Sequence, residues 1–139
     1  MKEFIVIIAA IMLLMVFVMQ YSIQQVNDYK LNAFQQHVYV AKEKAKLSGM
    51  FTTEIKNELV NSICDTFKDI SESEIIIDVT DDVKKYRTNE FDERELIHYR
   101  IGVPINKIIA AAKFFGISDE HNKGYYIIEG ETTSELIMP

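Results

Sequence analysis

The most reactive side chain in this sequence belongs to Cys64, the single cysteine. Its thiol, with His98 or His121 as a base, would form a nucleophile of the kind used in covalent catalysis. Cys64, however, flanks an apolar helical stripe, where a free cysteine usually acts as a small buried hydrophobic residue. We therefore expect no catalytic residue and no enzyme activity. A single cysteine also excludes a disulfide within the chain.

Acidic turns offer a second kind of chemistry, namely calcium binding. Asp78, Asp81 and Asp82 form one acidic cluster, and Ser118–Glu120 forms another. Neither has the spacing of a known calcium loop. The histidines, including His37, lack the spacing of a zinc site, and the glycines form no nucleotide-binding motif. The sequence therefore predicts no cofactor and no metal site, while calcium binding by an acidic turn stays open.

The strongest signal is an uninterrupted apolar run at the start of the chain, from Phe4 to Met19. As a helix this run is about 24 Å long, slightly less than a hydrocarbon core of about 30 Å. Tyr21 follows where an interfacial aromatic residue belongs. The side chains expected to contact the membrane or neighbouring helices are Phe4, Ile8, Ile11, Leu14, Phe17, Val18 and Tyr21.

Two other interpretations of this run fit the sequence less well. A cleaved secretory signal has a shorter apolar region and a small-x-small cleavage site, which the residues after Met19 do not provide. A buried core helix is seldom apolar on every face in so short a chain. We therefore expect a retained, single-pass membrane anchor. Lys2 precedes the run and the next basic residue is Lys30, which predicts a cytoplasmic N-terminus and an extracytoplasmic remainder.

The helix is expected to continue to Ser48-Gly49 without interruption, because no Gly or Pro intervenes. Its second half is amphipathic. The apolar positions recur at steps of three and four residues or their sums, and they predict a stripe for packing between subunits: Ile23, Val26, Phe34, Val38 and Ala41. Glu3 suits the helix N-terminus and could pair with the N-terminal amine of a neighbouring subunit.

The remaining residues predict a small α+β head, defined as residues 49–139. Thr52 or Thr53 caps a second helix to about residue 68, with an apolar stripe at Ile55, Leu59, Ile63 and Phe67. Strands are expected at 74–80, at 96–103, ended by Pro104, and from Tyr125 towards Ser134. A short helix is expected over 105–115, with Ile108, Ile109, Ala112 and Phe115 inward. The predicted fold is a long helix, a second helix and a mainly antiparallel three-stranded sheet with a helical insertion.

Composition limits the class of partner. The chain has room for one domain beyond the helix of residues 1–48. Acids and bases balance over residues 1–71, so the net charge of −6 lies in residues 72–139. An acidic head repels phosphate backbones, and we expect no nucleic acid partner.

The apolar N-terminal helix, its amphipathic continuation to Ala41–Gly49 and the tail Tyr126–Glu135 resemble TadE-like minor pseudopilins of tight-adherence (Tad) pilus systems. The resemblance implies a pilin-like fold and a structural role in a surface filament or secretion pseudopilus, with adhesion or secretion as the process served. Its implied partners are copies of itself or other pilins, the membrane and an assembly machinery. One departure is that Met1–Phe4 lacks the glycine at which prepilin leaders are cut.

Spacing alone leaves a second interpretation open. A single-pass accessory or sensor protein, whose acidic head binds a protein partner, would need the same anchor and the same supporting helix. Whether the chain is a major or a minor subunit, and what the head contacts, do not follow from the sequence.

Overall fold

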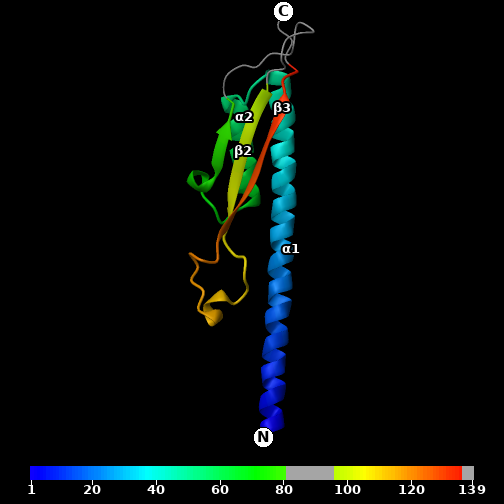
Figure 1. Ribbon diagram of the computed structural model, residues 1–139, viewed down its shortest axis with the longest axis vertical. Helices are drawn as coiled ribbons and strands as arrows, with labels where there is room; N and C mark the ends of the chain where they lie inside the picture. Colours follow the sequence, from blue (N-terminus) through cyan, green and yellow to red (C-terminus); the bar gives the residue numbers. More distant parts are fainter. Residues whose placement is uncertain (81–95, 136–139) are drawn as a thin grey trace, which may run out of the picture. The chain divides into compact units, whose positions relative to one another are not determined.

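The computed structural model describes residues 1–80 and 96–135, and Figure 1 shows the order of their helices and strands. The elements are α1 (Lys2–Ser48), α2 (Thr53–Thr66), the 3-10 turn η1 (Glu72–Glu74), β1 (Ile76–Val79), β2 (Leu96–Ile105), the 3-10 turn η2 (Ala112–Phe115) and β3 (Gly124–Thr133). The predicted α+β layout of a long helix, a second helix and three strands is confirmed.

The helix α1 is a single element without a break at Gln20, as the lack of Gly and Pro predicts. It ends at Ser48, and Gly49 takes the left-handed conformation (φ 78°) that favours glycine after a helix. The end of α1 receives a further bond, because the Glu135 backbone N–H donates to the Lys46 carbonyl at 2.9 Å. Residues near the C-terminus therefore satisfy a carbonyl group that the helix itself leaves open.

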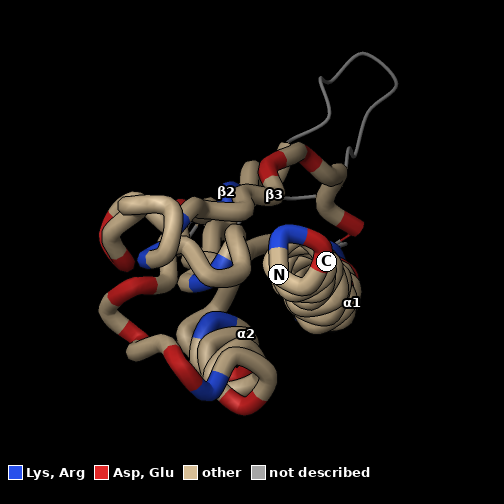
Figure 2. The backbone as a smooth tube through the Cα atoms, turned by 90° about the horizontal axis from the view of Figure 1, so that it is seen from below, with Lys and Arg blue, Asp and Glu red and all other residues tan. Residues whose placement is uncertain are grey.

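The helix α2 begins where its cap was predicted. The Thr52 side chain accepts a hydrogen bond from the Ile55 backbone N–H at 3.2 Å, and Glu54 lies in the first turn. An ion pair between Lys44 and Glu58 joins α1 to α2 at the surface. Figure 2 shows acidic and basic positions interspersed along α2 and along the connecting segments.

The three strands form one sheet in the order β1-β2-β3, with β1 antiparallel to β2. Across β2 and β3, His98 pairs with Glu131 and Arg100 pairs with Glu129, so the two strands also run in opposite directions. Gly130 lies against the Tyr99 ring, where a Cβ would meet the phenolic oxygen at 2.7 Å. A larger residue at this point of β3 would require the Tyr99 ring to shift.

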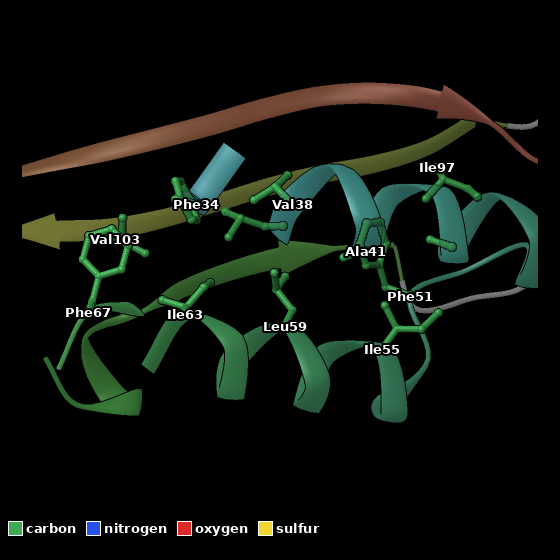
Figure 3. Close-up of a cluster of buried hydrophobic side chains, with 12 residues drawn as sticks. Phe34, Val38, Ala41, Phe51, Ile55, Leu59, Ile63, Phe67, Ile97 and Val103 are labelled. Atoms are coloured by element: carbon green, nitrogen blue, oxygen red, sulfur yellow. The ribbon is translucent and has the colours of Figure 1, made fainter. Parts of the chain in front are cut away.

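The hydrophobic core joins α1, α2 and one face of the sheet, as Figure 3 shows. The α2 stripe predicted from a spacing of four residues is buried as expected. Tyr99, Tyr126 and Ile128 complete the core from β2 and β3. The buried cluster consists of Phe34, Val38, Ala41, Ala45, Phe51, Ile55, Leu59, Ile63, Phe67, Ile97, Ile101 and Val103.

The sequence prediction was wrong about residues 104–115. Pro104 does not end the second strand, which continues to Ile105, because Pro104 lies beyond the residues of β2 that pair with β1. The expected helix over 105–115 is only the turn η2, preceded by Ala111 in the left-handed conformation (φ 53°). Of its four residues expected to face inward, Ala112 is buried, whereas Ile108, Ile109 and Phe115 are exposed.

The chain divides into two compact units, each considered by itself. Unit 1 comprises Met1–Lys30 with Ile105–Gly124, and unit 2 comprises Leu31–Pro104 with Tyr125–Pro139. The predicted boundary between residues 48 and 49 stays a prediction. The exposed turn expected after Thr80, with Asp81 and Asp82, lies outside the described residues.

Replacement of Phe34 by alanine should strongly destabilise unit 2. The ring is fully buried and meets Phe67 and Tyr126 edge to face, with ring centroids 6.3 and 6.0 Å away. Removing a buried phenylalanine costs about 3–5 kcal/mol of the free energy of unfolding. Urea unfolding of the full chain in detergent, followed by circular dichroism, measures the loss. The control Tyr39→Ala, an exposed site on the same helix, should change it by less than about 0.5 kcal/mol.

Candidate functional site

The most distinctive surface in the described chain is the first part of α1. The seven residues predicted to contact the membrane all point outward with side chains 38–68% exposed: Phe4, Ile8, Ile11, Leu14, Phe17, Val18 and Tyr21. The most apolar stretch of α1 has a mean hydropathy of 2.7 and is 0% buried within the chain. By length and composition, α1 is compatible with a transmembrane helix.

The described part of the chain contains one helix of this length and hydropathy. Its backbone N–H and C=O groups bond to each other within the helix, as a span in a lipid bilayer requires. Glu3 lies in its first turn, where a carboxylate stabilises the helix dipole. The predicted pairing of Glu3 with a neighbouring amine stays a prediction.

The predicted subunit-packing stripe divides into two groups. Phe34, Val38 and Ala41 are buried in the chain's own core and are therefore unavailable to a neighbouring subunit in the folded protein. Ile23 is half-buried, and Val26 is exposed. The packing of this stripe between subunits stays a prediction, and the periodicity alone could not show that the chain's own core would cover three of its five residues.

A second apolar stripe on α1 contains Val26 and three residues that the sequence reasoning missed. Val26, Tyr29, Val40 and Leu47 are all exposed on α1, and their spacings of 3, 11 and 7 residues place them along one side of the helix. We refer to these four residues as the outer stripe. The signal was present in the sequence, because each spacing is a sum of three- and four-residue steps.

Polar side chains on α1 hold the loop between β2 and β3, defined here as residues 106–123. The Gln20 side chain donates to the Ile108 carbonyl at 2.8 Å and accepts from the Ala110 N–H at 2.7 Å. Asn27 donates to the Lys107 carbonyl at 2.8 Å. Gln20 is the first polar residue after the apolar run, so its hydrogen bonds place part of the loop beside the end of that run.

The outer face of the sheet carries an open polar hollow. It is bordered by the pairs His98–Glu131 (3.0 Å) and Arg100–Glu129 (3.6 Å), together with Asp78. All four paired side chains are more than half exposed, so solvent weakens their attraction. Such a surface suits recognition of another protein through charges better than proton transfer in a closed site.

The cysteine is poorly suited to nucleophilic chemistry. Burial raises the pKa of the Cys64 thiol, and the nearby carboxylates of Glu72 and Asp65 raise it further. Because the thiolate is the reactive form, these effects lower its reactivity at neutral pH. Among residues 1–80 and 96–135, no three His, Cys, Asp or Glu side chains gather as a metal site would need.

The side chains of the second acidic turn, Ser118–Glu120, make contacts with nearby residues of the same loop. Ser118 Oγ lies 2.6 Å from His121 Nδ1, and Asp119 pairs with Lys113 at 3.5 Å. Asp78 lies in β1, apart from this turn in the chain. The side chains of Ser118, His121 and Asp119 in this turn therefore each have a polar neighbour within the protein.

Acid should lower the free energy of unfolding through His37, a partly buried side chain of α1 that contacts α2. The Nε2 atom lies 2.9 Å from Thr66 Oγ1, whose hydroxyl donates to the Ser62 carbonyl, so Nε2 carries the hydrogen. Desolvation lowers the pKa of His37 below its ordinary value, against a smaller opposing effect of Asp65. The unfolded chain therefore takes up the proton first, and the free energy of unfolding falls as pH falls through about 6.5.

Urea unfolding at about pH 7.5 and about pH 5.5 measures this dependence. The variant His37→Gln should show a smaller loss between the two values, whereas His121→Gln, in an exposed turn, should retain the original loss. An unchanged loss in His37→Gln would assign the pH dependence to other groups.

Comparison with known proteins adds no family. No family model, no curated protein and no solved structure matches this chain. The functional proposal is therefore based on the exposure and burial of side chains along α1 and on the residues that contact it.

Proposed function

We propose that this chain is a membrane-anchored, pilin-like structural subunit that packs through α1 into a surface filament or secretion pseudopilus. The supporting observation is that two parts of one unbroken helix differ in the exposure of their apolar side chains. Residues 4–19 expose apolar side chains on every face, while Phe34, Val38 and Ala41 of the same helix lie in the core. A subunit that is stored in a bilayer and later packed among copies of itself needs both properties.

The burial of apolar surface drives the proposed assembly. Outside a bilayer, each exposed large side chain of residues 4–19 would cost roughly 1.5–3 kcal/mol relative to a buried one. Neighbouring α1 helices can supply that burial. The outer stripe adds apolar surface beyond Gln20 that a neighbouring helix could bury. Val26, Tyr29 and Val40 are exposed there, on a different side of the helix from the core.

The proposed topology is a single pass with the N-terminus in the cytoplasm. It follows from the position of Lys2 before the apolar run and of Lys30 after it. Under this topology the acidic head lies outside the cytoplasm, and the partners are other copies or other pilins and their assembly machinery.

A second candidate is a single-pass accessory or sensor protein whose head binds a protein partner. The polar hollow beside His98, Arg100, Glu129 and Glu131 favours it, because exposed charges of both signs suit recognition of another protein. This candidate requires the anchor but no lateral contact between α1 helices.

Crosslinking through engineered cysteines distinguishes the two candidates. In a Cys64→Ala background, Tyr29→Cys with Val40→Cys places two thiols on the outer stripe. The matched control Asp28→Cys with Tyr39→Cys has the same separation but is shifted by one residue to another exposed face. Treatment of intact cells with a bifunctional maleimide should give a ladder of oligomers for the outer-stripe pair and far less for the control. A monomer in both cases would contradict lateral packing through this stripe.

The anchor is tested separately from assembly. Leu14→Lys places a charge in the middle of the apolar run, at a cost of about 2.5–3.5 kcal/mol for insertion at a helix centre. The variant should shift from the membrane fraction to the alkaline carbonate extract. Tyr29→Lys, an exposed site beyond the run, should remain in the membrane. Full retention of Leu14→Lys would count against a spanning helix under both candidates.

A further inference from the structure

Two adjacent phenylalanines in the loop of residues 106–123 are exposed to an unusual degree. Phe114 is 82% exposed and Phe115 57%, and their rings meet edge to face with centroids 5.4 Å apart. Single exposed apolar residues are common on proteins, but a pair of large aromatic rings presented side by side marks a contact surface.

The backbone that carries this pair is well held within unit 1. The buried Asn122 side chain accepts from the N–H groups of Ile108 and Ile109 and donates to the Ile109 carbonyl. On the other side of the pair, the Ile117 N–H donates to the Ala112 carbonyl at 2.9 Å. The phenylalanines therefore project from a turn whose backbone bonds are satisfied, and their exposure is a feature of the folded loop.

The loop lies where the apolar part of α1 ends. Gln20 binds the loop backbone at Ile108 and Ala110, and the apolar run stops one residue earlier, at Met19. Figure 1 shows this segment, drawn in yellow to orange, extending from Ile105 in the direction of the N-terminus beside the blue part of α1. Within unit 1, the loop that carries η2 is therefore attached to α1 directly after the end of the apolar run.

The apolar run is also slightly short for a bilayer. Residues 4–19 provide about 24 Å of helix, against about 30 Å of hydrocarbon. A second apolar element beside the outer end of the run would add apolar surface where the helix meets the boundary of the bilayer. Lys113, which pairs with Asp119, can keep its charged end at the headgroups while its stem lies along apolar surface.

We propose that Phe114 and Phe115 insert into the lipid bilayer, at the boundary between headgroups and acyl chains, next to the point where α1 enters it. This inference rests on the proposed membrane anchor and adds a second contact to it. The occupant of the aromatic pair is lipid, because Gln20 holds the loop that carries the pair at the end of the apolar run of α1, which the bilayer would cover. Two contacts, one through α1 and one through η2, would restrict rotation of unit 1 about the helix axis.

The absence of tryptophan from the sequence allows a direct test. Phe114→Trp introduces the single tryptophan at an exposed site, so the full chain should fold normally. Met12→Trp, in the apolar run, serves as the control for deep insertion. Tyr39→Trp, exposed on α1 about 30 Å beyond Met19 along the helix, serves as the control for water. Each variant is reconstituted in phosphatidylcholine vesicles with and without brominated lipid, and acrylamide quenching is measured in parallel.

The expected result is a blue-shifted emission for Phe114→Trp, with clear loss of intensity in brominated lipid and protection from acrylamide. Its behaviour should approach that of Met12→Trp. If Met12→Trp is quenched by lipid while Phe114→Trp behaves like Tyr39→Trp, the anchor stands and this inference is wrong. If Met12→Trp is not quenched, the proposed anchor itself fails.

One further outcome identifies a different occupant. A blue shift of Phe114→Trp that requires high protein concentration, without quenching by brominated lipid, would assign the surface to a second copy of the chain and overturn the lipid contact. Phe115→Trp repeats the measurement one residue away, so the conclusion does not depend on one substitution being tolerated.

Discussion

The structure depends on the burial of one side of α1 between residues 34 and 45. Phe34, Val38, Ala41 and Ala45 belong to the same buried cluster as the α2 stripe and the inner face of β2. Without them, α2 and the sheet would lack one wall of the core. Residues 34–45 of α1 therefore belong to the same core as α2 and the sheet. Any function in which α1 moves, from a bilayer into a filament for example, must carry this core along with it.

Much of this arrangement could be predicted because it has a local cause. The length of α1 follows from the lack of Gly and Pro before Gly49, and the start of α2 follows from a threonine cap at Thr52. The buried stripe from Ile55 to Phe67 follows from a spacing of four residues. The alternation of Ile97, Tyr99 and Ile101 with polar neighbours predicts a strand with one face in the core.

The rest depends on contacts between residues far apart in the sequence. Residues 105–115 have the apolar spacing of a helix, but Asn122 and Gln20 bind the backbone groups of residues 108–110 that a helix would use. Similarly, periodicity predicts that Val38 faces an apolar partner without telling whether that partner is the same chain. Three members of the outer stripe, Tyr29, Val40 and Leu47, were not predicted, because polar residues separate them and α1 already has one apolar side.

The bond from Glu135 to the carbonyl of Lys46 has a consequence for the order of folding. Synthesis proceeds from the N-terminus, so α1 leaves the ribosome long before β3 and the residues that follow it. The contact between the rings of Phe34 and Tyr126 can form only after Tyr126, 92 residues later in the sequence, has been synthesised. Contacts over such separations form slowly compared with helix formation. During synthesis there is therefore an interval in which α1 is complete but the apolar side that later joins the core is still exposed. A chaperone would be most needed during that interval.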